Sequence, residues 1–150
     1  TIQLNPGWNL ISINVIPNDS TIPTIFSSVL TSISEVKSLD GFYNPTQLNY
    51  YNSLQHIKQA EGYLVNVKGQ TPLTIQITGN PSTKKVAVAK SGYSLIGCPY
   101  QTTQQISTIF SSILSTIDLV KNFEGFYIPG NAANSINTLD PGKGYFVKKK

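Results

Sequence analysis

The chain has 150 residues, which fits one domain or two small ones and allows roughly 68–70% of the unfolded surface to be buried. Its 39% of apolar residues excludes a disordered tail. The net charge of +4 comes from lysine alone. Because arginine is the preferred side chain for phosphates and guanine edges, we expect no nucleic-acid partner. No apolar run reaches the roughly 18–20 residues that span a bilayer, so no transmembrane segment is expected.

The polar composition favours a location outside the cell. Only 12% of the residues are charged, whereas Ser, Thr, Asn and Gln together supply about a third of the chain. This balance is unusual for a cytosolic enzyme and common in extracellular modules of bacteria and archaea. Cys98 is the only cysteine, so no intramolecular disulfide can form. The sequence therefore predicts an extracellular or cell-surface protein.

A duplicated stretch dominates the sequence. Residues 22–45 and residues 106–129 are identical at 14 of 24 aligned positions. In each copy, apolar residues recur at helical spacing and are followed by a strand pattern that ends in Gly-Phe-Tyr. One unit, an amphipathic helix leading into a strand, is therefore expected twice.

The first copy contains one predicted helix among several strands. Alternation at Ile2 and Leu4 predicts a strand, and Asn5-Pro6-Gly7 predicts a tight turn. A helix is expected at 22–33, and further strands at 8–16, 36–43, 62–67 and 73–77. A polar loop that carries tyrosines spans 46–59, and residues 79–83 form the expected boundary between the copies.

The second copy follows the same order with one omission. Residues 86–88 align with the strand at 2–4, residues 92–96 with 7–11, and residues 106–117 with the helix. Residues 144–147 align with 62–65, but the sequence reaches Lys150 with no counterpart of the strand at 73–77. If the copies pack as similar units, one sheet ends in an unpaired edge, and open edges invite pairing with another chain.

The predicted fold is α+β, with two tandem homologous repeats, each a small and mostly antiparallel β-sheet with one amphipathic helix packed on it. Repeat one spans residues 1–80 in the order β-β-α-β-β-β. Repeat two spans residues 81–150 in the order β-β-α-β-β, without the final strand. The pattern leaves open whether the repeats sit as separate beads or form one pseudo-twofold domain.

The order of the motifs resembles a known family. Leu4 and Gly7-Trp8-Asn9-Leu10-Ile11-Ser12, then an Ile/Phe helix, then Gly62-Tyr63-Leu64-Val65 and residues 139–147, are similar to repeats often called GWNLIS-type. Such repeats occur in secreted and cell-surface proteins of bacteria and archaea, usually beside adhesion or carbohydrate-binding modules. Copy two departs from the pattern, because Gly92-Tyr93-Ser94 replaces Gly7-Trp8-Asn9. The resemblance covers essentially the whole chain and implies an extracellular setting, but its motifs are turns and strands.

Residues suited to catalysis are scarce, and we expect no catalytic residue, no metal site and no cofactor. His56 is the sole histidine, which excludes a histidine-rich metal site. Cys98 fits a small buried core residue better than a nucleophile. Asp40 and Glu124 stand at equivalent positions before a glycine, as turn residues do. An enzyme that uses these two carboxylates as an acid–base pair is the least favoured alternative.

Aromatic side chains are the remaining candidates for ligand recognition. Those shared by both copies, such as Trp8 and Tyr93, are expected to pack. A candidate sugar-binding site, in which amides would supply hydrogen bonds, comprises the unshared tyrosines and their neighbours: Asn49, Tyr50, Tyr51, Asn52 and Tyr100. The alternative is that these tyrosines only anchor their loop.

The favoured hypothesis is a non-catalytic extracellular structural subunit that self-associates through exposed strand edges into a filament or surface layer. The candidate self-association residues lie in the first and last strands: Thr1, Ile2, Gln3, Leu4, Tyr145, Phe146 and Val147. Its partner would be another copy of the chain or another surface protein. The alternative is a carbohydrate-binding or adhesive module of a secreted protein, whose partner would be a glycan.

Overall fold

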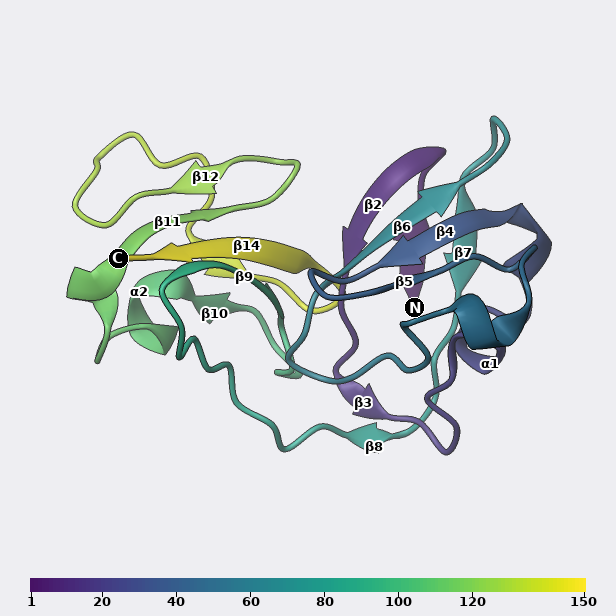
Figure 1. Ribbon diagram of the computed structural model, residues 1–150. Helices are drawn as coiled ribbons and strands as arrows, with labels where there is room; N and C mark the ends of the chain where they lie inside the picture. Colours follow the sequence, from purple (N-terminus) through teal and green to yellow (C-terminus); the bar gives the residue numbers. More distant parts are fainter.

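The computed structural model describes residues 1–150 and is mostly β, with several small antiparallel sheets and a few short helices. Two four-stranded sheets lie beside each other (Figure 1). The N-terminus lies near one of them, and the C-terminus lies at the end of a strand of the other. We call residues 1–80 the N-terminal half and residues 81–150 the C-terminal half. No helix is long and apolar enough to cross a membrane.

The two larger sheets have the same strand order. The first has the order β2-β6-β4-β5 and contains β2 (Gly7–Ile11), β4 (Ile33–Lys37), β5 (Phe42–Tyr43) and β6 (Tyr63–Val67). The second has the order β9-β14-β11-β12 and contains β9 (Gly92–Gly97), β11 (Ile117–Lys121), β12 (Phe126–Tyr127) and β14 (Gly144–Lys149). Each sheet therefore has a hairpin at one side and an edge strand, β2 or β9, at the other.

Three two-stranded sheets complete the fold. They pair β1 (Ile2–Leu4) with β7 (Leu73–Ile75), β3 (Val15–Ile16) with β8 (Asn80–Pro81), and β10 (Gln104–Gln105) with β13 (Thr138–Leu139). In the first of these, Ile2 lies opposite Ile75 and Leu4 opposite Leu73, in antiparallel register. The apolar side chains of β1 and β7 therefore share one face, which covers the N-terminal core.

The helices are much shorter than the apolar spacing predicts. The α-helices are α1 (Ile22–Ile25) and α2 (Ile106–Ile109), and the 3-10 segments are η1 (Leu30–Ser32), η2 (Asn49–Tyr51) and η3 (Leu114–Thr116). After α1 the chain continues in turns, in which Val29 N donates to Phe26 O and Ser32 N donates to Val29 O. The predictions of helices at 22–33 and 106–117 are therefore wrong in extent.

The strands at 8–16 and 36–43 are also interrupted, contrary to the prediction. The second forms a hairpin, because Ser38 N donates to Gly41 O across the turn at 2.9 Å. The first ends at Ile11, and the chain then crosses the junction between the halves before β3 begins. The residues at 86–88 form no strand either, although their alignment with β1 predicts one.

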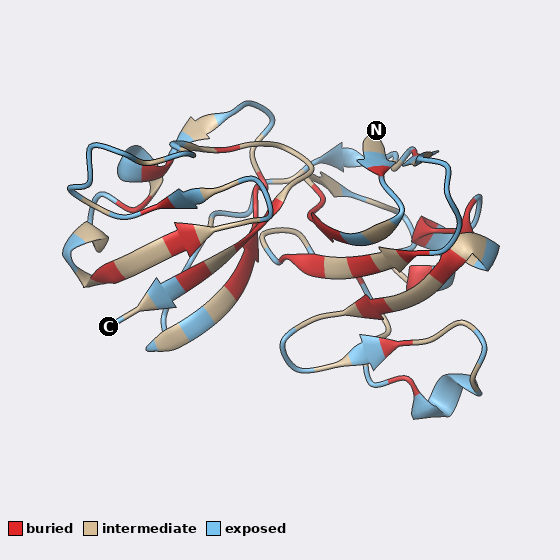
Figure 2. Ribbon diagram, turned by 90° about the horizontal axis from the view of Figure 1, so that it is seen from above, coloured by how far each residue is buried: buried red, intermediate tan, exposed pale blue.

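The molecule has two hydrophobic cores that share no residue. The N-terminal core includes Leu4, Phe26 and Val65, and the C-terminal core includes Phe110 and Val147. Figure 2 shows the buried residues concentrated along the strands, with exposed loops around them. Each half therefore has a core of its own, and the halves are not joined by a shared core.

Main-chain hydrogen bonds join the halves where each edge strand ends. Gly62 N donates to Leu95 O at 3.2 Å and Gly97 N donates to Ala60 O at 3.0 Å. On the matching side, Ser12 N donates to Gly142 O at 3.1 Å. The end of β2 therefore meets the turn before β14, and the end of β9 meets the turn before β6.

Candidate functional site

The segment from Thr83 to Ser91 makes no hydrogen bond between main-chain groups. Figure 1 shows it as a plain tube between β8 and β9. Its side chains nevertheless alternate, since Val88 is only 6% exposed and Val86 is half-buried against the C-terminal core, whereas Ala87 is exposed. The segment therefore has the side-chain pattern of a strand without a strand partner.

A few side chains hold the segment in place. Val86 N donates to the Tyr100 hydroxyl at 3.2 Å, and Lys149 Nζ donates to the carbonyls of Val88 and Ala89 at 3.3 and 3.4 Å. The main-chain groups of Ala87 receive no hydrogen bond from the protein. We call residues 84–90 the acceptor edge.

The N-terminal half supplies the comparison that explains the acceptor edge. There, β1 occupies the aligned position and pairs with β7 through three residues on each strand. Leu4 of β1 is fully buried, as Val88 nearly is. In the C-terminal half, no strand takes the place that β7 fills, so Val86–Val88 is left at an open edge.

The acceptor edge contains three lysines. Lys84, Lys85 and Lys90 are exposed, and none of them lies within 4 Å of a carboxylate. Charged side chains on an edge strand oppose pairing of two identical edges, because like charges would then face each other. No candidate site is predicted here from the sequence, although the alignment of residues 86–88 with β1 indicates a strand at this position.

The self-association residues predicted from the sequence lie in two different settings. Thr1 and Gln3 are exposed, Ile2 is half-buried and Leu4 is buried, and their strand β1 is paired with β7 on one side. Tyr145, Phe146 and Val147 lie in β14, which is paired with β9 on one side and β11 on the other. Phe146 and Val147 therefore have a strand on both sides, whereas Tyr145 is paired with Ile96 of β9 only.

The predicted sugar-binding residues are only partly brought together. Tyr50 and Tyr51 lie on η2 with ring centroids 4.2 Å apart, and they are 73% and 58% exposed. Asn49 beside them is exposed. Tyr100 lies in the C-terminal half, where its hydroxyl holds the acceptor edge.

Asn52 has a structural role in the same loop. Its side chain is buried, its Oδ1 accepts hydrogen bonds from Asn44 N and from the Gln47 side chain, and its Nδ2 donates to Asn44 O. Asn134 bridges the matching loop of the other half in the same way, through the main chain of Ile128. The polar atoms of Asn52 are thus already used within the protein.

Two matching clefts of about 250 Å³ each flank the junction between the halves. One lies between the hairpin turn at Leu39–Asp40 and the residues Glu61, Ala87 and Lys90. The other lies between the turn at Phe123–Glu124 and the residues Trp8, Asn5 and Lys143. Asp40 and Glu124 therefore lie in different clefts, one in each half, and do not form a pair.

The second cleft contains an ion-pair network. Lys143 Nζ lies 2.7 Å from Glu124 and 3.5 Å from Asp140, and the hydrogen bond to Glu124 raises the pKa of the lysine. Trp8 is exposed beside the cleft, but Lys37 Nζ lies 5.4 Å from its ring centroid. Part of this aromatic surface is thus already used within the protein.

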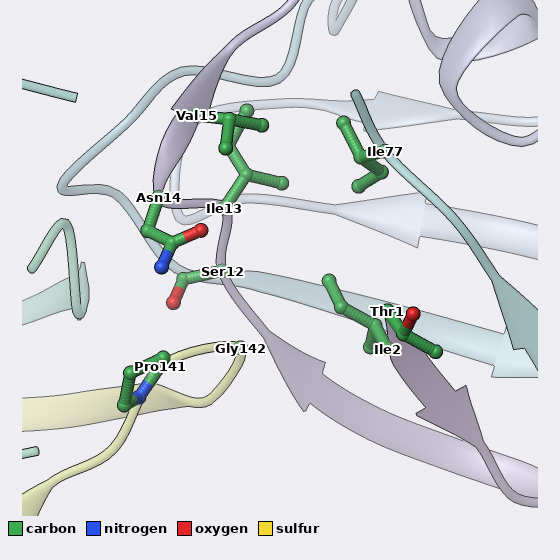
Figure 3. Close-up of a pocket in the computed structure, with 9 residues that line it drawn as sticks. All are labelled: Thr1, Ile2, Ser12, Ile13, Asn14, Val15, Ile77, Pro141 and Gly142. Atoms are coloured by element: carbon green, nitrogen blue, oxygen red, sulfur yellow. The ribbon is translucent and has the colours of Figure 1, made fainter. Parts of the chain in front are cut away.

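A smaller cavity of about 130 Å³ lies at the junction itself (Figure 3). Ser12 and Asn14 face it from the N-terminal half, and Pro141 and Gly142 from the C-terminal half. Asn14 Nδ2 donates to Tyr100 O, and the side chain of Gln101 donates back to Asn14 O. These contacts connect the halves and leave the amide of Asn14 engaged.

Titratable groups do not converge on a catalytic arrangement. Burial raises the pKa of the Cys98 thiol, whose Sγ donates to Leu139 O. His56 Nδ1 lies 3.0 Å from Ser20 Oγ on the exposed surface, and the nearby Asp19 carboxylate accepts from Thr21 N and Thr24 Oγ1. No three His, Cys, Asp or Glu side chains lie close enough together to hold a metal ion.

No protein-family model, no curated protein and no solved structure matches this chain. The likeness to GWNLIS-type repeats therefore depends on the motifs quoted above. Among the surfaces described, the acceptor edge is the one that most lacks a partner in the chain.

Proposed function

We propose that this protein is a non-catalytic structural subunit of an extracellular or cell-surface assembly, and that it self-associates through its exposed strand edges. The observation that carries the proposal is the acceptor edge, where Val86–Val88 has the burial pattern of a strand and no strand partner. Main-chain groups without a strand partner are a template for another strand. Here Val86 N and the carbonyls of Val88 and Ala89 contact side chains only, and the main chain of Ala87 has no partner. The partner is a second copy of the chain or another surface protein.

The proposal includes a duplicated origin for the two halves. Each half is a copy of one unit, a small antiparallel sheet with a short helical segment against it. Matching contacts support this interpretation. The hydroxyl of Tyr63 accepts from Lys58 N, and the hydroxyl of Tyr145 accepts from Asp140 N, five residues upstream in each case.

A proline in the acceptor edge tests the proposed function. Ala87→Pro removes a main-chain donor at the centre of the edge, whereas Ala87 is exposed and its side chain contributes little to the core. The size of the particles is measured by light scattering after gel filtration over a range of concentrations, and their shape by electron microscopy. We expect larger species for the wild type and monomers for the variant.

Ala132→Pro, in an exposed loop of the same half, is the control. Its particles should have the wild-type size. A wild type that stays monomeric at every concentration, or an Ala87→Pro variant that assembles as the wild type does, would contradict the proposal.

The alternative function is glycan binding, and the pair Tyr50–Tyr51 favours it. Two large aromatic side chains exposed side by side on a turn, next to exposed amides, suit stacking against a sugar ring. The double variant Tyr50→Ala/Tyr51→Ala should lose binding on a glycan array while keeping its thermal stability. If the wild type binds no glycan on the array, the glycan-binding alternative is wrong.

A further inference from the structure

A second open edge lies in the N-terminal half. β7 has β1 on one side and no strand on the other, and residues 76–79 after it make no main-chain hydrogen bond. The side chains alternate along this stretch, with Ile75 buried, Leu73 and Ile77 half-buried, and Thr74 and Gln76 exposed. We call residues 73–79 the donor edge.

The donor edge and the acceptor edge have the same alternation of apolar and exposed side chains. Within the chain, β7 is the strand that pairs with β1, and Val86–Val88 aligns with β1 in both position and alternation. Apolar residues at alternate positions of both edges allow one face of a joint sheet to be covered by the cores. β1 occupies one side of β7, so a strand of a second copy would lie on the outer side, where Leu73, Ile75 and Ile77 continue the alternation.

Charge favours this combination over the pairing of two acceptor edges. Two copies of residues 84–90 side by side would bring Lys84, Lys85 and Lys90 of each chain together. The donor edge carries no charge of its own, and Asp19 lines the same cleft as Gln76 and Ile77. Its carboxylate accepts two hydrogen bonds that lower its pKa to about 2, so it is negatively charged at neutral pH.

The other candidate donor in the chain is less suitable. Residues 1–4 are the predicted self-association strand, but Leu4 is fully buried and β1 is already paired with β7. Donation of β1 to another molecule would require this pair to open. β7 has no strand on its outer side, so pairing there leaves the β1–β7 pair intact.

On the basis of the proposed self-association, we propose that the acceptor edge of one copy pairs with the donor edge of a second copy. The interface is heterologous, because the two edges are different surfaces of the same chain. After two copies pair, one of them keeps a free donor edge and the other keeps a free acceptor edge. Such a head-to-tail contact yields an open chain of subunits unless the rotation between neighbours closes a ring.

Cysteine cross-linking between two differently tagged variants tests the pairing. Thr74 and Ala87 are exposed; Thr74 is the middle residue of β7, and Ala87 is the middle residue of the acceptor edge. The variants Thr74→Cys and Ala87→Cys are mixed and treated with a short bis-maleimide, which tolerates a slip in register. The native Cys98 is buried and contributes little background. We expect a mixed product that contains both tags, and mass spectrometry should locate the link at residues 74 and 87.

The control is Thr46→Cys, an exposed position away from both edges, mixed with Ala87→Cys. In that mixture the mixed product should be lost. A product between two Ala87→Cys chains would overturn the proposal in favour of symmetric pairing.

The experiment separates the two proposals. Gel filtration that shows larger species without a 74–87 link would overturn the donor assignment and leave self-association standing. If the wild type forms no larger species and no link appears, both proposals fail.

Discussion

Ser12 and Gly97 meet at the junction between the halves, at matched ends of β2 and β9. A Cβ atom on Gly97 would overlap the Cβ of Ser12 and would lie 2.7 Å from Glu61 O. Ser12 is fully buried, and its hydroxyl donates to Lys143 O and accepts from Cys98 N. Only one of these two equivalent positions therefore has room for a side chain, and the serine there connects two strands of the other half.

The first prediction concerns this crowding. Gly97→Ala should lower the free energy of unfolding by about 1–3 kcal/mol, because the extra methyl group meets atoms that are fixed by the junction. Urea denaturation measures the loss. The exchange variant Ser12→Gly/Gly97→Ser restores one small and one larger residue at the contact and should recover part of the stability. An exchange variant no more stable than Gly97→Ala would argue against crowding as the cause.

The second prediction concerns the turns before β6 and β14, in which Ala60 and Gly142 occupy the same position. Ala60 has φ 67°, a left-handed conformation that favours glycine, and Gly142 at the matching position has φ 88°. Ala60→Gly should therefore raise the melting temperature, by up to about 2–4 °C for a gain near 1 kcal/mol. Gly142→Ala should lower the free energy of unfolding by about 1–2 kcal/mol.

Space does not decide the outcome at the second turn, because a Cβ on Gly142 would meet only Ile2 Cγ1, at an ordinary 3.7 Å. The opposite signs expected for the two variants are the check, and calorimetry of both variants measures them. Equal effects of the same sign would show that φ strain is not the determining factor.

The third prediction is a pH dependence. Hydrogen bonds from Thr24 and Thr21 lower the pKa of Asp19 from 3.8 to about 2. Its ionised form is therefore stabilised in the folded protein, and the contribution is present above about pH 4 and is lost as the pH falls toward about 2. Asp19→Asn should show a smaller loss of stability over this range than the wild type.

Asp40→Asn is the control for this prediction, because the Asp40 carboxylate accepts no hydrogen bond and the residue is exposed. Thermal denaturation at about pH 5 and about pH 2 provides the comparison. If the wild type and Asp19→Asn lose stability in parallel, the capping bonds of Asp19 do not contribute.

The fourth prediction separates two residues of the candidate sugar-binding loop. Asn52→Ala should lower the free energy of unfolding by about 1–3 kcal/mol, because Asn44 N then loses its acceptor. Tyr50→Ala should change it by less than about 0.5 kcal/mol, since the tyrosine is exposed. The same urea titration measures both variants. A Tyr50→Ala variant as unstable as Asn52→Ala would indicate that the tyrosine anchors the loop.

The sequence allowed the strands to be placed better than the helices. Strong alternation predicts the strands at 2–4, 62–67 and 73–77, and the structure has strands there, with the last one ending at Ile75. The apolar stripe from Ile22 to Ile33 predicts a helix, and most of its residues are indeed buried. The chain nevertheless follows tighter turns in both copies. In the second copy, Thr116 Oγ1 donates to Ile113 O, a kind of bond that competes with helical main-chain bonds.

The two hairpins could have been predicted from the sequence. Asp40-Gly41 and Glu124-Gly125 separate two apolar runs, and such dipeptides indicate a turn between strands. Treating residues 36–43 as one strand overlooks this signal. The junction between the halves could not be predicted, because it depends on which main-chain groups meet in space, and Ser12 and Gly97 carry no pattern that shows their proximity.

The candidate site was predicted in outline only. The alignment of residues 86–88 with β1 predicts a strand there, but the sequence alone suggests the chain's first strand as the self-association strand. The structure places β1 beside β7 and leaves residues 73–79 and 84–90 without partners on their outer sides. Which edge remains free is decided by the pairing within the chain, and alternation in a single sequence carries no information on that pairing.

The separate cores have a mechanical consequence. Because they share no residue, a pulling force applied between the halves acts on the hydrogen bonds at the junction, among them those of Ser12, Gly62 and Gly97. We expect these bonds to break before either core is exposed to water. In a row of such subunits under tension, each broken junction would lengthen the row by a small step while both halves stay folded. The row would shorten again when the junction bonds re-form.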